Sequence, residues 1–236
     1  MPRLRRPGRN VIRALVFDFD GLVFDSETHE YAVIRDIFRE HGAELPLEVW
    51  GTCVGTHSGA FDAHAYLEEC VGRPMDREEI ARLRRERFLA RIEREGALAG
   101  VEACLEAARA MGLRVGLASS SRREWVVGQL SRLGLLPCFE AVRTADDVEH
   151  VKPDPELYLG VLDALGVAPA EAVAFEDSPN GALAARRAGM RVVVVPNSVT
   201  AALEFGGHDL RLESLEVELA TLLARLAETP DSATGS

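Results

Sequence analysis

The sequence predicts an α/β fold: an open parallel sheet with helices on both faces and an inserted all-helical domain. Short apolar runs alternate with helical patterns over residues 114–196, the order expected of strands joined by crossover helices. Residues 27–99 interrupt this alternation and carry only helical patterns. Hydrophobic residues make up 47% of the 236 positions, so a substantial core can form.

The predicted strands are short, and most are apolar at successive positions. They are 11–17 (VIRALVF), 114–119 (RVGLAS), 140–144 (EAVRT), 172–176 (AVAFE) and 191–196 (RVVVVP). The continuous apolar run at 191–196 is typical of a parallel strand that is buried on both faces.

Helices are predicted between the last four strands, and each has a start signal. Ser121 and Glu124 have capping-box spacing and open a helix that ends at Gly134. Asp154 opens the second helix and Ser178 the third, each with a proline at the first helical position. The regular alternation supports a doubly wound sheet.

The helical insertion contains two amphipathic segments, 27–42 and 76–96, and a glycine-rich stretch at 50–59 that we expect to be a loop facing the site. The predicted division is therefore a catalytic core formed by 1–26 and 100–227, a helical domain at 27–99, and a disordered tail at 228–236.

Composition excludes several classes of protein. The formal net charge of −11 argues against nucleic acid and anionic membranes as partners. The four cysteines are dispersed, so neither a zinc site nor a disulfide framework is expected. There is no apolar run near 18 residues and no secretory signal, so we expect a soluble, cytoplasmic protein without a membrane span.

Polar residues gather where the predicted strands end. They are Asp18 and Asp20, Ser119 to Ser121, Lys152 in the loop after the third strand, and Glu176 with Asp177. Each has an ordinary alternative as a turn, cap or surface residue. Because ligands bind at the carboxyl ends of parallel strands, their convergence on one edge predicts a functional site.

The residue types at this edge point to metal and phosphate chemistry. In an extended segment, Asp18 and Asp20 lie on the same side, and Asp177 adds a third carboxylate. Such a cluster needs a cation or must take up protons, and oxygen ligands without His or Cys favour Mg²⁺. A lysine, hydroxyls and backbone N–H groups suit a phosphate, so Asp18 could attack phosphorus.

Four segments resemble the ordered motifs of the haloacid dehalogenase superfamily: DFDGLVFDS (18–26), ASSS (118–121), VKPDPELY (151–158) and FEDSPNG (175–181). The resemblance covers nearly all of residues 11–200. It is to the phosphatases and β-phosphoglucomutase-like enzymes that carry a helical cap after the first motif. It implies a Rossmann-like core, with residues 27–99 as the cap.

The resemblance implies a role for each matching residue. Asp18 corresponds to the nucleophile that becomes an aspartyl phosphate, and Asp20 to the general acid and base. Ser119 and Lys152 correspond to the groups that hold the transferring phosphoryl oxygens. The implied Mg²⁺ ligands are Asp18, the Asp20 backbone carbonyl, Glu176 and Asp177. The phosphate- and substrate-binding set is Gly21, Ser119, Ser120, Lys152 and His57.

The expected activity is Mg²⁺-dependent hydrolysis of a small phosphomonoester, such as a sugar phosphate, by a monomer or small homo-oligomer. One alternative is a β-phosphoglucomutase-like phosphohexomutase. Glu30 stands where those mutases carry a His, and the loop with His57 and Ser58 lacks their Arg. A second alternative is a non-catalytic phosphate-sensing protein on the same fold.

Overall fold

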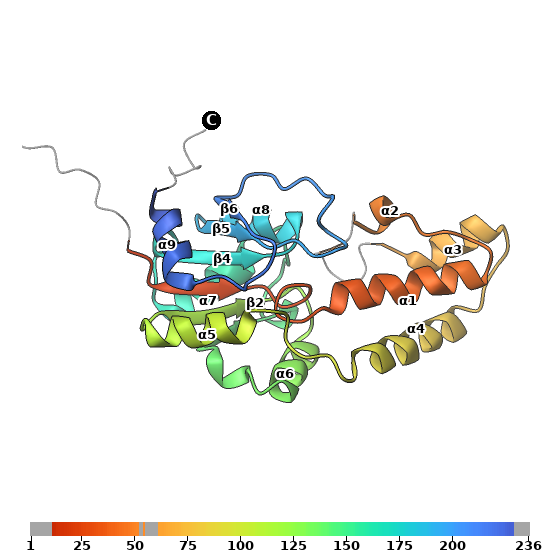
Figure 1. Cartoon of the computed structure of the whole chain (residues 1–236). Helices are drawn as coiled ribbons and strands as arrows, with labels where there is room; N and C mark the ends of the chain where they lie inside the picture. The colour runs from red at the N-terminus through yellow and green to blue at the C-terminus, as the bar shows by residue number, and fades with distance from the viewer. Residues whose placement is uncertain (1–10, 52–53, 55–60, 229–236) are drawn as a thin grey trace, which may run out of the picture.

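The structure is a computed structural model that describes residues 11–51, 54 and 61–228. Its centre is a sheet in which every neighbouring pair of strands is parallel, in the order β3-β2-β1-β4-β5-β6 (Figure 1). The strands are β1 (Ala14–Phe17), β2 (Arg114–Ala118), β3 (Ala141–Arg143), β4 (Ala172–Glu176), β5 (Arg191–Val194) and β6 (Leu210–Arg211). The predicted parallel α/β fold is confirmed. The two-residue β6 was not predicted, because a strand so short has no periodicity to detect.

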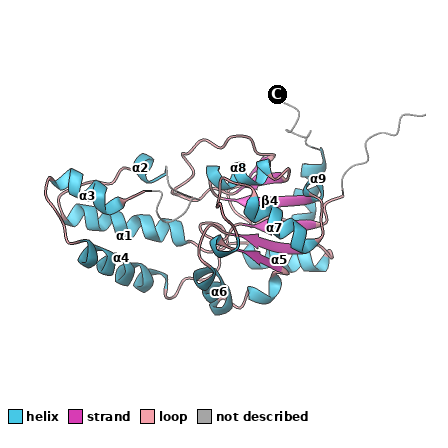
Figure 2. Ribbon diagram, turned by 180° about the vertical axis from the view of Figure 1, so that it is seen from behind, coloured by secondary structure: helices cyan, strands magenta, loops and turns pink. Residues whose placement is uncertain are grey.

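Helices cover both faces of the sheet (Figure 2). One face packs against α5 (Val101–Ala110), α6 (Arg123–Arg132) and α9 (Leu219–Glu228), and the other against α7 (Glu156–Leu165) and α8 (Pro179–Arg187). Side chains of β1 alternate between the two: Leu15 and Phe17 enter the first core cluster, and Ala14 and Val16 the second. Short 3₁₀ turns lie at Leu136–Cys138, Ala145–Asp147 and Pro169–Glu171.

The start of α8 is as predicted. Ser178 is its N-cap, and the Ser178 hydroxyl accepts from the Gly181 N–H at 3.1 Å. The helix predicted from Asp154 begins later, at Glu156. Asp154 still contributes there, because its Oδ1 accepts from the Glu156 N–H at 3.1 Å. Both starts therefore use the side chains that the sequence singled out.

The capping box predicted at Ser121 and Glu124 is wrong. The N-cap of α6 is Arg122, whose own side chain makes no capping bond, and Asp146 Oδ2 accepts from the Arg123 N–H at 2.7 Å. The Ser121 hydroxyl instead donates to Asp20 Oδ2 at 2.6 Å. The helix start offers only N–H donors, whereas the carboxylate at a neighbouring strand end accepts from the Ser121 hydroxyl, and only the folded chain brings that carboxylate near.

The helical insertion forms its own layer beside the sheet (Figure 1). Its elements are α1 (Ser26–Glu40), α2 (Leu47–Gly51), α3 (Ala63–Val71) and α4 (Arg77–Ile92). They enclose a separate apolar cluster that includes Ile34, Ile37 and Phe38. Trp50 and Gly51 belong to α2 rather than to the predicted loop, most of which, His57 included, lies outside the described residues.

Helices α1 and α4 are joined by ion pairs that cross between them. Arg87 pairs with Glu40 at 2.7 Å and Arg91 with Asp36 at 2.6 Å. Each exposed pair contributes about 0–1 kcal/mol, so the apolar cluster between the helices provides most of their association. Over the described part of the chain, none of the helices has the length and apolar character needed to cross a bilayer.

Candidate active site

The end of β1 places two aspartates at the edge of the sheet. The Asp18 N–H donates to the Phe175 carbonyl of β4 at 3.0 Å, which continues the ladder to the carboxylate itself. Asp18 is only 5% exposed. Asp20, two residues on, is half-buried, while Phe19 between them is fully buried. The alternation of an extended chain therefore presents both acids to one side.

Lys152 lies between two of the buried acids. Its ammonium contacts Asp18 Oδ1 and donates to Glu176 Oε1 at 2.7 Å, and the residue is 2% exposed. Burial alone would lower the pKa of Lys152, but the charges of Asp18 and Glu176 outweigh it and raise that pKa. The Tyr158 hydroxyl also donates to Glu176 Oε1. Lys152 is therefore held charged and immobile beside Asp18.

Three buried carboxylates meet at this point. Asp18, Glu176 and Asp177 each place one oxygen within 4.8 Å of the others. Burial, followed by the opposing influence of Lys152, sets the pKa of Asp18, which rises to about 8. Burial and the charges of Asp18 and Glu176 raise the pKa of Asp177 far above its usual range. One lysine does not balance three acids, so the cluster binds protons or a cation.

The donor set fits a divalent cation that prefers oxygen. Asp177 Oδ1 is buried and has no hydrogen-bond partner, which leaves it free to act as a ligand. No His or Cys belongs to the carboxylate cluster found among the described residues. All-oxygen sites of this kind suit Mg²⁺ rather than Zn²⁺. The residues present can therefore hold such an ion.

Gly21 brings the chain unusually close to this cluster. Its φ is +82°, and a Cβ there would lie 2.3 Å from Asp177 Oδ2. The Gly21 N–H already donates to the Phe24 carbonyl at 2.7 Å, so it offers no free donor to a phosphate. Asn197, which sequence reasoning missed, donates to Asp177 Oδ2 at 2.7 Å. Gly21 thus makes room for Asp177 and Asn197.

Asp20 is surrounded by hydrogen-bond donors. Oδ1 accepts from the Ser26 hydroxyl at 2.6 Å and from the Trp125 indole at 2.9 Å. Oδ2 accepts from the Ser121 hydroxyl at 2.6 Å and from the Ser119 hydroxyl at 3.4 Å. A carboxylate has about four acceptor positions, and three of these bonds are short enough to hold it firmly. Asp20 is therefore fixed in orientation.

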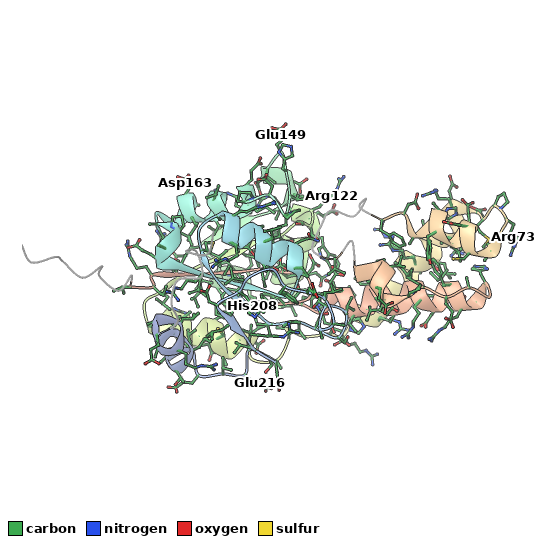
Figure 3. The ribbon with its side chains drawn as sticks, turned by 90° about the horizontal axis from the view of Figure 1, so that it is seen from above. Arg73, Arg122, Glu149, Asp163, His208 and Glu216 are labelled. Atoms are coloured by element: carbon green, nitrogen blue, oxygen red, sulfur yellow. The ribbon has the colours of Figure 1, made fainter. Side chains whose placement is uncertain are left out.

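A cavity of about 500 Å³ opens from Asp20 toward the helical insertion. Its walls include the aromatic side chains of Trp50, Phe61, Phe88 and Trp125. Ser120 and Arg122 line it from the core, and Figure 3 shows Arg122 on the core, away from Arg73 at the far end of the helices. The cavity is large enough for a small organic substrate whose reacting group lies near Asp20.

Two acids from α1 border the same cavity. Burial, and then the charge of Asp20, raise the pKa of Glu27 to about 8. Glu30 forms an ion pair with Arg84 of α4, and its side chain is 17% exposed. His29, one residue earlier, lies instead 3.6 Å from Glu95. Among the described residues of the insertion, Glu27, Glu30 and Arg84 are thus the charged groups that line this cavity.

The structure brings the predicted strand-end residues together: Asp18, Asp20, Ser119, Lys152, Glu176 and Asp177. Sequence reasoning missed Asn197, Tyr158, Ser26 and Trp125. Asn197 follows the apolar run at 191–196, and its place after a strand end was the available signal. Trp125 is one apolar residue of a helix, and nothing in the pattern separates it from a core residue.

Comparison with known proteins decides the family. The model of the haloacid dehalogenase-like hydrolases matches residues 15–195, which contain all the strand-end residues predicted from the sequence. The chain belongs to the haloacid dehalogenase-like hydrolases. This family also accounts for the metal-competent acids, because its members generally use a divalent metal.

Named relatives of this hydrolase include phosphatases. The phosphatase YhcW of Bacillus subtilis is 57% identical over 217 residues, covering 92% of this chain and 98% of the relative. Hexitol phosphatase B of Escherichia coli is 32% identical over 187 residues, covering 78% and 84%. The crystal structure of a mutant of CbbY from Rhodobacter sphaeroides with xylulose-1,5-bisphosphate has a TM-score of 0.69 at 28% identity, covering 87% of this chain and 95% of that one. The predicted phosphoric monoester hydrolase of this family is confirmed.

Proposed function

We propose that this hydrolase cleaves a small phosphorylated sugar or polyol with Mg²⁺, through an aspartyl phosphate on Asp18. The observation that carries the proposal is the meeting of Asp18, Glu176 and Asp177 with Lys152 at one buried point. The cavity beside Asp20 supplies room for the organic part of the substrate. No other cluster of metal-competent side chains was found in the part of the chain that the structure describes.

In the first step, an Asp18 oxygen attacks phosphorus, and the bond from phosphorus to the alkoxide oxygen breaks. Asp20 gives its proton to that leaving oxygen, because an alkoxide is a poor leaving group without one. In the second step, Asp20 takes a proton from a water molecule as the water attacks the same phosphorus. The bond to Asp18 breaks, and inorganic phosphate and free enzyme are released.

The chain's own groups hold the transferring phosphoryl. Lys152, which is fixed against Asp18, is a charged donor for the oxygens of the phosphoryl group. The buried Ser119 hydroxyl is a second donor for them. Ser120 lines the cavity and is a third candidate. Asp18, the Asp20 backbone carbonyl, Glu176 and Asp177 would hold Mg²⁺. When bound, the ion neutralises phosphate charge that would otherwise repel the carboxylate nucleophile.

We propose hydrolysis rather than mutase activity because Glu30 forms an ion pair with Arg84. Glu30 stands where the phosphohexomutases carry a His, and it is engaged with Arg84. The names of the relatives support a phosphorylated sugar or polyol, since one is a hexitol phosphatase and another was crystallised with a ketopentose bisphosphate. His57 lies outside the described residues, and a role for it in binding stays a prediction.

A panel of sugar and polyol phosphates with Mg²⁺ tests the proposal. Inorganic phosphate should be released from some members of the panel, and EDTA should stop the release. Asp18→Asn, which keeps the side-chain shape and removes the nucleophile, should lose turnover on every member. Phosphate release that persists in Asp18→Asn would overturn the proposal. Interconversion of hexose 1- and 6-phosphates without release would instead support the mutase.

A further inference from the structure

Trp125 forms a hydrogen bond with the carboxylate of Asp20, the residue that transfers protons in the proposed function. Its indole Nε1 donates to Asp20 Oδ1 at 2.9 Å, on the same oxygen that accepts from Ser26 at 2.6 Å. The second oxygen, Oδ2, accepts from Ser121 at 2.6 Å. The two oxygens of Asp20 therefore have different partners, which fixes the orientation of the carboxylate.

An indole N–H is a donor only, whereas a serine hydroxyl can donate or accept. Ser26 and Ser121 can rotate their hydroxyls toward other partners, but the Trp125 indole can only donate, so it keeps Oδ1 in one place. With Oδ1 held by Trp125 and Ser26, the other oxygen, Oδ2, is turned toward Ser121 and Ser119. Oδ2 also lies 3.4 Å from Ser119, the residue proposed to hold the phosphoryl group. Oδ2 is thus the Asp20 oxygen on the side of the proposed phosphoryl site.

The ring of Trp125 rests on the helical insertion. Its centroid is 5.7 Å from that of Phe88 in α4 and 6.2 Å from that of Phe24. Phe88 packs against the core cluster that contains Phe17 and also against the cluster inside the insertion that contains Phe38. Asp20, Phe88 and Trp125 all line the same cavity. One side chain therefore connects the position of α4 to the orientation of the carboxylate.

We infer that Trp125 is a positioning residue for Asp20. Its indole N–H holds the Asp20 carboxylate with Oδ2 toward Ser119, and its contact with Phe88 makes that orientation depend on how the helical insertion packs on the core. The inference rests on the proposed function, because it needs Asp20 to protonate a leaving oxygen. It adds to that function a residue from outside the four sequence motifs.

Trp125→Phe tests the inference, because it keeps a ring against Phe88 and removes the N–H. The readout is kcat/KM for phosphomonoesters whose leaving groups range from an alkyl alcohol to 4-nitrophenol. General-acid catalysis contributes about 10²–10⁴-fold where the leaving group is poor. We expect Trp125→Phe to lose about 10- to 100-fold on alkyl phosphates and less than about 3-fold on 4-nitrophenyl phosphate. Phe88→Ala should show the same dependence on the leaving group, with a smaller loss.

Trp50→Phe is the matched control, since Trp50 is the other tryptophan of the chain and lines the same cavity. Its effect should be the same factor for every leaving group. An equal loss on all substrates in Trp125→Phe, or no loss at all, would overturn the inference. If the loss depends on the leaving group in Trp125→Phe but not in Phe88→Ala, the proposed link between Asp20 and the helical insertion is overturned. Thermal unfolding of each variant identifies one that fails to fold.

Asp18→Asn separates failure of this inference from failure of the proposed function. If Asp18→Asn loses turnover while Trp125→Phe shows no dependence on the leaving group, only the inference fails. If Asp18→Asn keeps turnover, the proposed function fails, whatever Trp125→Phe does. Asp20→Asn supplies the positive control: its loss should be the steepest of the series as the leaving group becomes poorer.

Discussion

Gly181 of α8 lies directly against the carboxyl group of Glu176. A Cβ on Gly181 would come within 2.0 Å of Glu176 Cδ. The first turn of α8 can approach the buried acid cluster only because this position has no side chain. The glycine near the end of the fourth motif is therefore a packing requirement of Glu176, rather than a source of flexibility.

Gly181→Ala should destabilise the protein by about 1–2 kcal/mol, because overpacking exceeds the gain in helix propensity. Turnover should fall as well, since the added methyl group moves Glu176 away from Lys152. Gly128→Ala in α6 is the matched control, because a Cβ there meets nothing within 4 Å. It should stabilise by about 0.5–1 kcal/mol. Urea unfolding measures both, and a Gly181→Ala variant as stable and active as the wild type would contradict the packing argument.

The stabilisation of the protein by Mg²⁺ should depend most clearly on Asp177. Saturating Mg²⁺ at about 100-fold its Kd should stabilise the wild type by about 2.7 kcal/mol. Asp177→Asn should lose most of this response, because it removes one negative charge from the cluster. In EDTA, the same variant should be at least as stable as the wild type, since a buried like-charge repulsion is gone.

Asp209→Asn is the control for the metal experiment. Asp209 is also buried, but it lies near Arg186 and Arg191 rather than in the acid cluster. Its Mg²⁺ response, measured by thermal unfolding with and without EDTA, should match that of the wild type. An unchanged response in Asp177→Asn would remove this residue from the ion's ligands.

Stability should depend on pH through Glu27. Burial raises the pKa of Glu27 in the folded state to about 8, above the value of about 4.3 in an unfolded chain. A raised pKa means that the stabilisation is complete below the unfolded pKa and is lost as pH rises through the folded one. Glu27→Gln has no proton to lose, so relative to the wild type it should gain about 1–3 kcal/mol between about pH 5 and pH 9.

The Glu27 experiment compares urea unfolding of the two proteins in EDTA. The difference between the two proteins reports the titration of Glu27 together with its charge coupling to Asp18, Asp20 and Asp177. Glu27 borders a solvent-accessible cavity, and solvent screens its charge there. The expected gain in the free energy of unfolding of Glu27→Gln is therefore smaller than the full pKa shift of Glu27 would give. A constant difference between the two proteins across this range would contradict the burial argument for Glu27.

Specificity should change when Arg84 is released. Glu30 neutralises Arg84 at the border of the cavity, so Glu30→Gln leaves a free cation there. The ratio of kcat/KM for a sugar bisphosphate to that for the matching monophosphate should rise about tenfold, or about 1.4 kcal/mol. Glu40→Gln breaks the Arg87 pair between the same two helices, away from the cavity, and should leave the ratio unchanged. A ratio that moves equally in both variants would contradict a local role.

The strand-end acids could be predicted because chain order and parallel topology are enough to bring them together. Asp18 and Asp177 follow β1 and β4, and these strands are neighbours in the sheet. Any doubly wound sheet with this order places both at one edge. Lys152 needed only a loop of the right length after β3. The fold and the centre of the site were therefore readable from local patterns and spacing.

Contacts between distant side chains were not readable in this way. Ser121 has a capping pattern, yet its hydroxyl bonds to Asp20, a residue 101 positions away. Trp125 reads as one apolar position of a helix, and its N–H partner becomes visible only in three dimensions. At such positions the hydroxyl or indole N–H donates to a charged acceptor from a distant segment, which a local sequence pattern does not contain.

The most direct test of the account is chemical identification of the phosphorylated residue. A substrate labelled in its phosphoryl group is mixed with the enzyme and Mg²⁺ and quenched in acid within one turnover, and the label is then mapped to a peptide. The account predicts a label on the peptide that contains Asp18, and greater accumulation in Asp20→Asn if that variant slows hydrolysis more than transfer. Turnover without protein-bound label, or a label on another residue, would contradict it.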